Sequence, residues 1–287
     1  MTIDFLINSA LALMMFNIGA SLRFSDFKRI LKHLKPIIIG ISLQMIFLPL
    51  LTFTILSFIN IPPVSKMGIF ILSLCPGGST SNFVSYLVKS DVALSVLLTG
   101  INSFIILFTL PALTTFGYYY YFSKANVIVT LPYFEIITNV LLITLLPVIL
   151  GILFRHFATA FASAIQSTLK HVSITALFLV FAIKIFGTTD QGGSGLVWLD
   201  LKEIFPPLIA IHLAAIFSSY LIAKKTLKDQ RKSVTIGIEV GLQNTALALL
   251  VATVLLSNED LGKPAVIYSG FSFFTTYLFG WWMIKRN

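Results

Sequence analysis

The chain has 287 residues, of which 57% are hydrophobic and only 11% are charged, and its mean hydropathy is +0.94. Soluble domains carry roughly 25% charged residues, so this composition excludes a protein that meets water on all sides. Apolar stretches of about 20 residues, long enough to cross a hydrocarbon core of about 30 Å, recur along the chain and predict an all-α polytopic membrane protein.

Charged or Pro/Gly-rich breaks divide these stretches into about nine predicted transmembrane helices. They cover residues 4–22, 36–59, 67–88, 92–116, 132–155, 169–187, 204–223, 233–256 and 264–284. The N-terminal segment lacks the basic region and cleavage site of a signal peptide, so we interpret it as the first span. Because the connections are short, we expect one transmembrane transporter domain over residues 1–287.

The net charge of +9 arises mainly from alternate connections. One set of connections holds 15 of the 20 Lys and Arg residues, namely Arg23, Lys28, Arg29, Lys32, Lys35, Lys89, Arg155, Lys170, Lys224, Lys225, Lys228, Arg231, Lys232, Lys285 and Arg286. This asymmetry places the C-terminus in the cytoplasm and, with nine spans, the N-terminus outside. We therefore expect a protein of the plasma (inner) membrane, with the lipid bilayer and not a nucleic acid as its partner, and no obligatory protein partner.

The third and eighth predicted spans are interrupted. Pro76-Gly77-Gly78 breaks the third span and is followed at once by polar residues, and glycines and polar residues interrupt the eighth span at 239–245. Backbone unwinds at membrane depth only where it is buried in protein or lines a cavity. Each interrupted span is third in a group of four, and the two groups are offset by five spans and so run in opposite directions. This pattern predicts an inverted repeat and a secondary transporter with a site at the midplane. A tenth helix before Met1 would supply the partner that the fifth span lacks.

Glu239 is the only acidic residue that we place deep inside a span. An ionisable group there costs about 2.5–3.5 kcal/mol on insertion scales, so it needs a partner. No Lys or Arg lies at matching depth, which favours bound Na⁺ or a carried proton. A protonated Glu239 hydrogen-bonded to a neighbouring helix is the structural alternative.

Oxygen-bearing side chains suited to Na⁺ surround both breaks. They are Ser81, Asn82, Gln243 and Asn244, together with Ser95 and Thr99 on one helix face and the isolated amide of Gln44. Taken singly, each has a structural interpretation, because Ser and Thr often bond to their own helix and a lone Gln often joins two helices. Taken together with Glu239, they predict one or two Na⁺ sites. The unpaired N–H groups that open the second half-helices, at Ser79-Thr80 and Asn244-Thr245, predict an anionic substrate.

Residues 75–82 with 89–96, and residues 239–244, resemble the two signature motifs of the bile acid:sodium symporter family. The likeness extends over most of the chain, although Leu242 stands where Met is common in the family. The resemblance implies a core domain in which the two discontinuous helices cross (about 36–116 and 204–256). It also implies a panel domain, to which we assign 4–22, 132–187 and 264–284.

By motif position, the resemblance implies two sodium sites and a substrate site. Sodium site 1 would use Ser81, Asn82, Ser95, Thr99 and Glu239; sodium site 2 would use Gln44, Glu239, Gln243 and the carbonyls of Val240 and Leu242; the substrate would contact Ser79, Thr80 and Asn244. The expected function is sodium-coupled symport of an organic anion, a bile acid or a small carboxylate, by alternating access. Proton coupling through Glu239 is the first alternative. An intramembrane enzyme is disfavoured, because no His lies near Ser79, Ser81 or Cys75 in a recognisable pattern.

Overall fold

A computed structural model describes residues 34–123, 146–187 and 193–285, with isolated positions between 9 and 20. Every regular element within these residues is a helix. The elements are α3 (Leu34–Ser42), η1 (Leu43–Phe47), α4 (Leu48–Phe58), α5 (Pro63–Leu74), α6 (Ser79–Leu87), α7 (Val92–Ser123), α9 (Leu146–Phe157), α10 (Thr159–Phe186), α11 (Trp198–Leu227), α12 (Gln230–Gly241), α13 (Thr245–Leu249), η4 (Leu250–Leu255) and α14 (Glu259–Lys285), where η marks a π-helical segment.

Several of these helices suit a membrane. Leu34–Phe58, Trp198–Leu227 and Gln230–Leu255 are each long and apolar enough to cross one, and α7 adds a fourth span if its two arms are taken together. The arms of α7 meet at 60°, at residue 107. Pro111 explains this bend, because its ring clashes with the carbonyl four residues earlier and cannot bond to it. The predicted spans at 4–22 and 132–155 lie largely outside the described residues, so nine spans stay a prediction.

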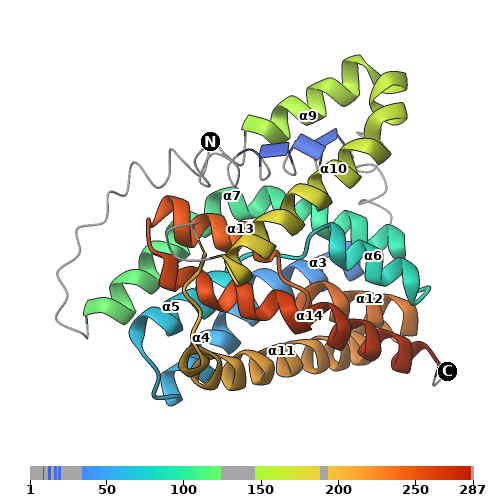
Figure 1. Ribbon diagram of the computed structural model, residues 1–287. Coiled ribbons are helices and arrows are strands. Elements are labelled where there is room, and N and C mark those ends of the chain that lie inside the picture. Colours follow the sequence, from blue (N-terminus) through green and yellow to red (C-terminus); the bar gives the residue numbers. More distant parts are fainter. Residues whose placement is uncertain are drawn as a thin grey trace.

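A bundle is formed by α5, α7, α11, α12 and α14, which pack on one another (Figure 1). α9 and much of α10 lie at one edge of this bundle (Figure 1). There, the backbone of Phe16 and Ala20 lies directly against Gly151 of α9. The described part of the first predicted span therefore packs with α9.

The last helix, α14, packs against the bundle. Its main contacts are with α5, α11, α12 and α13, and its contact with α10 is small. Gly68 of α5 permits the approach, because a Cβ there would lie 2.5 Å from the Leu261 carbonyl oxygen. The prediction for residues 264–284 groups this helix with residues 132–187, but the structure packs it with the interrupted helices.

Both predicted interruptions are present, and they have similar geometry. α5 and α12 each have 12 residues, and each is followed by an extended residue, Cys75 (φ −95°, ψ 99°) and Leu242 (φ −109°, ψ 98°). Pro76 explains the first break, since the residue before a proline is disfavoured in the helical region. The two breaks touch, because Asn244 N donates to Cys75 O at 3.2 Å.

Candidate ion and substrate site

Four polar side chains from three helices meet beside the touching breaks. Glu239 of α12 is 1% exposed, and its Oε2 lies 3.0 Å from Ser95 Oγ of α7. Its Oε1 lies 2.5 Å from Thr99 Oγ1, one turn further along α7. Asn82 of α6 completes the group, with its Oδ1 at 2.8 Å from Ser95 Oγ and 3.2 Å from Thr99 Oγ1. Four of the five residues predicted for sodium site 1 are therefore in direct contact.

This group has fewer protons than its contacts require. Each hydroxyl carries one proton, whereas carboxylate and amide oxygens only accept. The four oxygen–oxygen contacts of Ser95 and Thr99 therefore share two protons, which leaves facing lone pairs. A cation among the oxygens removes this repulsion, and a proton on Glu239 removes part of it, because three protons then serve four contacts. Turning the Asn82 amide so that Nδ2 faces the hydroxyls would also satisfy the group, without an ion.

Ser81, the fifth residue of this set, lies beside the carboxylate, close to Gly77. A Cβ built on Gly77 would lie 2.9 Å from Ser81 Oγ and 3.0 Å from Glu239 Oε1. Ser81 Oγ itself donates to Gly78 O at 2.7 Å. Glycine at position 77 is thus what allows the first break to approach Glu239 so closely.

A second polar group joins Gln44, Gln243 and Val240. Gln44 Nε2 donates to Gln243 Oε1 at 3.1 Å, and Gln243 Nε2 donates to Val240 O at 2.5 Å. Gln44 lies in the π-helical segment η1, a local irregularity that often marks functional sites. Its Oε1 is buried and has no hydrogen-bond partner among the described residues. Such an oxygen is costly to bury and is a suitable ligand for a hard cation.

The residues predicted for sodium site 2 could hold an ion only after two amides turn. Val240 O faces the NH₂ of Gln243, so an ion bound by both residues requires the Gln243 amide to rotate and present Oε1. Gln44 Nε2 donates to that Oε1, so the Gln44 amide must rotate as well. Leu242, the remaining residue of this set, has an extended backbone and directly follows the last residue of α12.

The two half-helices that follow the breaks begin differently. Asn244 Oδ1 accepts from Leu247 N at 3.1 Å and so caps α13. α6 begins at Ser79 after Gly78 with no side-chain hydrogen bond at its cap, and Thr80 is exposed. Since unpaired N–H groups at a helix start attract an anion, the start of α6 suits an anionic group better than that of α13.

Asn102 was missed by the sequence analysis. It is fully buried, and neither Nδ2 nor Oδ1 has a partner among the described residues. It follows Thr99 by three residues and Ser95 by seven, so all three occupy one face of α7. That spacing is the signal that could have found it.

A buried histidine holds the end of α12. His212 Nδ1 of α11 lies 3.0 Å from Gly241 O and 2.7 Å from Tyr268 Oη, and Tyr268 OH also donates to Gly241 O. His212 Nε2 lies 2.7 Å from Thr275 Oγ1. A cavity of about 20 Å³, room for about one water molecule, is lined by His212, Gly241, Tyr268 and Gln243. The last carbonyl of α12, between the predicted ligands Val240 and Leu242, is thus fixed by two other helices.

Residues 9–191 match the model of the Sodium Bile acid symporter family, which is more than half of the chain. The chain belongs to the sodium bile acid symporter family. The predicted membership is confirmed, and family membership together with the apolar helices makes the chain an integral membrane protein. The matched range includes the first break and ends before α12.

Curated relatives extend the similarity over most of the chain. The probable sodium/metabolite cotransporter BASS1 of rice (Oryza sativa subsp. japonica), a chloroplast protein, is 27% identical over 89% of this chain and 60% of its own length. The uncharacterized sodium-dependent transporter YocS of Bacillus subtilis (strain 168) is 27% identical over 90% of this chain and 77% of its own length. The ileal sodium/bile acid cotransporter of Cricetulus griseus is 29% identical over 88% and 70%. The chain spans about 60% of the length of the chloroplast relatives.

Proposed function

We propose that this chain is a sodium-coupled symporter of organic anions. The observation that carries the proposal is the buried Glu239 carboxylate, which lies among hydroxyl and amide oxygens where two broken helices touch. A carboxylate buried without Lys or Arg among its hydrogen-bond partners needs a bound cation or a proton to compensate its charge. The names of relatives as sodium/metabolite and sodium/bile acid cotransporters support Na⁺ as that cation.

Two sodium ions are proposed, both sharing Glu239. Site 1 uses Ser81, Asn82, Ser95, Thr99 and Glu239, and site 2 uses Gln44, Glu239, Gln243 and the carbonyls of Val240 and Leu242. The shortage of protons in the first group and the unpartnered Gln44 Oε1 in the second support these assignments. Bound Na⁺ would supply the positive charge that neutralises Glu239 and draws the oxygens of α6, α7 and α12 together.

The anionic substrate is proposed to bind at the start of α6, with Ser79, Thr80 and Asn244 as contacts. The lack of a side-chain cap on α6 and the position of the Asn244 amide beside Gly78 support this site. A helix start binds a carboxylate or sulfonate through N–H groups, without a basic side chain. The proposed substrate class therefore includes bile acids and smaller carboxylates alike.

Transport is proposed to proceed by alternating access between a core of α3–α7 and α11–α14 and a panel of residues 9–20, α9 and α10. The packing of α14 with the interrupted helices supports its place in the core. An inverted repeat relating α5 and α12 is supported by their equal lengths and matching breaks. Na⁺ binding organises the crossing first, and the two domains then rock to expose the site on alternate sides of the plasma membrane, with the C-terminus inside.

Proton coupling through Glu239 is the second candidate. It is favoured by the same hydrogen-bond arrangement, because a proton on the carboxylate would supply one of the two protons that the four contacts of Ser95 and Thr99 lack. The remaining possibility, an enzyme, has no support in a family of transporters.

The test is uptake of labelled taurocholate and labelled pantoate into proteoliposomes, with an inward Na⁺ gradient or with K⁺ in its place. Glu239→Gln removes the charge at the site, and Glu203→Gln of α11, outside the site, is the matched control. Uptake that requires Na⁺ and is lost only in Glu239→Gln is expected. Equal uptake in K⁺ that follows an imposed pH gradient would instead support proton coupling.

A further inference from the structure

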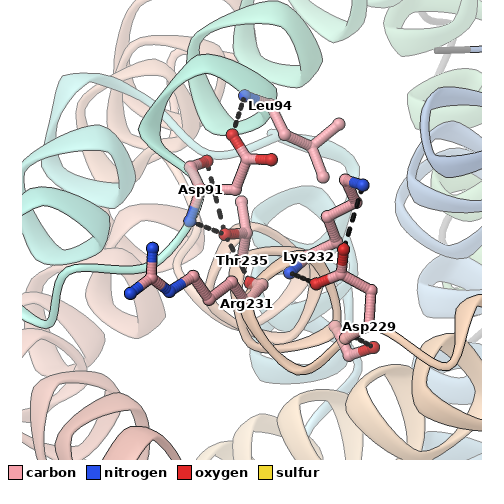
Figure 2. Close-up of polar contacts among 7 residues, drawn as sticks. Asp91, Leu94, Asp229, Arg231, Lys232 and Thr235 are labelled. Carbon is pink, nitrogen blue, oxygen red and sulfur yellow. Dashed lines mark hydrogen bonds and ion pairs between the residues drawn. The ribbon is translucent and has the colours of Figure 1, made fainter.

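α7 and α12 are joined a second time, one helical turn before the contact between Ser95 and Glu239. Thr235 precedes Glu239 by four residues, so both lie on one face of α12. Asp91 precedes Ser95 by four residues and stands directly before the first residue of α7. Asp91 N donates to Thr235 Oγ1 at 2.9 Å, as Figure 2 shows. Thr235 is fully buried.

These contacts form a closed ring between the two helices. Ser95 N donates to Asp91 O at 3.1 Å, the first backbone bond of α7, and Ser95 Oγ lies 3.0 Å from Glu239 Oε2. The ring runs from Thr235 through Asp91 and Ser95 to Glu239 and returns along α12. A shift of either helix along its axis would change both cross-helix distances together.

The Thr235 hydroxyl reaches α7 as an acceptor. Its proton has a nearer partner in Arg231 O, at 2.9 Å, than in Asp91 O, at 3.3 Å (Figure 2). Donation to the carbonyl four residues earlier is common for helical threonine and does not join two helices. Acceptance of the Asp91 N–H is therefore the specific contact, and its loss would leave that N–H without its partner.

Aspartates fix the starts of both helices independently. Asp91 Oδ1 accepts from Leu94 N at 3.0 Å, and Asp229 Oδ1 accepts from Lys232 N at 3.1 Å (Figure 2). Each aspartate caps its own helix, so neither sets where one helix stands relative to the other. The contact of Thr235 with Asp91, in contrast, joins the two helices at this end.

We propose that Thr235 is a positioning residue for the first sodium site. By accepting the Asp91 N–H, it holds α7 in the register that places Ser95 and Thr99 within ligand distance of Glu239. Thr235 itself binds no ion, and the inference rests on the proposed sodium coupling.

The test compares Thr235→Val, which keeps the shape but removes the acceptor, with Thr235→Ser, which keeps the hydroxyl. Thr253→Val is the matched control, because Thr253 is also buried in the same span and donates to its own helix at Leu249 O. The readouts are the Na⁺ concentration that gives half of the maximal uptake, and the Na⁺ concentration that gives half of the maximal thermal stabilisation. Thr235→Val should raise both by about three- to tenfold, the effect of one lost hydrogen bond, while maximal uptake is largely kept. Thr235→Ser and Thr253→Val should match the wild type.

Two results would overturn the inference while wild-type protein still responds to Na⁺. One is an unchanged Na⁺ dependence in Thr235→Val, even if that variant melts at a lower temperature. A residue that only stabilises the fold would lower the melting temperature without changing the Na⁺ dependence. The other is an equal change in the valine and serine variants, because the serine still accepts the Asp91 N–H. If the wild type has the same melting temperature and the same uptake in Na⁺ as in K⁺, the proposed sodium coupling itself is refuted.

Discussion

Gly77 and Glu239 are far apart in the sequence but nearly touch where the two breaks cross. A Cβ on Gly77 would lie 3.0 Å from the carboxylate Oε1 and 3.1 Å from the Glu239 carbonyl oxygen. These distances are shorter than an ordinary carbon–oxygen contact, and the groups that a side chain would meet include rigid backbone. At the residue scale, the site therefore depends on a missing side chain as much as on the polar ones.

Gly77→Ala should abolish Na⁺-dependent uptake, because its methyl group would push the first break away from Glu239. Gly270→Ala is the matched control, since a Cβ at position 270 meets nothing within 4 Å. Both variants should reach the membrane and elute as folded protein, and only the first should lose thermal stabilisation by Na⁺. Full Na⁺ dependence in Gly77→Ala would contradict the close approach.

Gln44→Leu should remove one Na⁺ site and spare the other. The substitution deletes the unpartnered Oε1 but leaves the contacts of Glu239 with Ser95 and Thr99 in place. The Na⁺ activation curve of uptake should become less steep, approaching the hyperbola of a single site. Thr52→Val, on the same span and also buried, should keep the wild-type steepness. Equal steepness in all three proteins would exclude Gln44 as a ligand.

The end of α12 is the element on which the second predicted site depends. Its terminal carbonyls receive donors from different places: Leu242 N bonds Ile238 O, Gln243 Nε2 bonds Val240 O, and Tyr268 OH bonds Gly241 O. Carbonyls at a helix end have no partner within the helix, so their directions are set by whatever caps them. At this scale, α11 and α14 determine how α12 ends.

Tyr268→Phe should therefore weaken Na⁺ binding through the backbone. The variant keeps the ring and removes the OH donor to Gly241 O, so the carbonyls beside it lose one restraint. The Na⁺ requirement of uptake should rise by about three- to tenfold. Tyr119→Phe, on an exposed side chain of α7, is the control. No change in the Na⁺ requirement would mean that His212 alone fixes this carbonyl.

The Asp229 carboxyl at the start of α12 predicts that the stability of the fold depends on pH. Burial raises the pKa of the Asp229 carboxyl, but hydrogen bonds from the Lys232 main chain and ammonium outweigh burial and hold this pKa below its usual range. A lowered folded-state pKa stabilises the fold above the unfolded pKa of about 3.9, and this contribution disappears as the pH falls through the folded-state value. Asp229→Asn still caps the helix. Between neutral pH and about pH 3, the melting temperature of this variant should therefore fall less than that of the wild type. Parallel pH curves would contradict this.

At the scale of the whole molecule, one ion pair ties the edge helices to the bundle. Lys184 of α10 is 1% exposed, and its Nζ lies 2.6 Å from Glu259 Oε2 at the start of α14. Ser194 binds the Lys184 carbonyl through both its N and its Oγ. The contact between α10 and α14 is otherwise small, so this pair is a main link between α10 and the start of α14.

Removing one charge of the ion pair between Lys184 and Glu259 should lower the melting temperature more than removing both charges. Glu259→Gln leaves a buried, unpaired ammonium, whereas Lys184→Met combined with Glu259→Gln leaves no buried charge. The single variant should therefore melt below the double variant in detergent. The reverse order would mean that the Lys184 ammonium is solvated without Glu259.

Local signals determined the class of protein and its family, and they predict the chemistry of the site. Long apolar stretches predict helices in a membrane, Pro76-Gly77-Gly78 predicts the first break, and Glu239 is recognisable because a carboxylate is rare within such a stretch. These features are readable because each one depends on a few consecutive residues. The touching of the two breaks and the contacts among Asn82, Ser95, Thr99 and Glu239 agree with what the paired motifs predict.

Only the tertiary structure decided which distant residues support that site. Segments far apart in the chain are joined by the packing of α14 in the bundle, by the hydrogen bond from Tyr268 OH to Gly241 O and by the contact of Asp91 with Thr235. The buried Asn102 looks like any polar residue near the middle of a helix until its surroundings are known. Hydropathy and helix-breaking residues have their effect within a short segment of sequence, so they can be read from it. These contacts depend on how neighbouring helices pack, and no pattern within one segment predicts that packing.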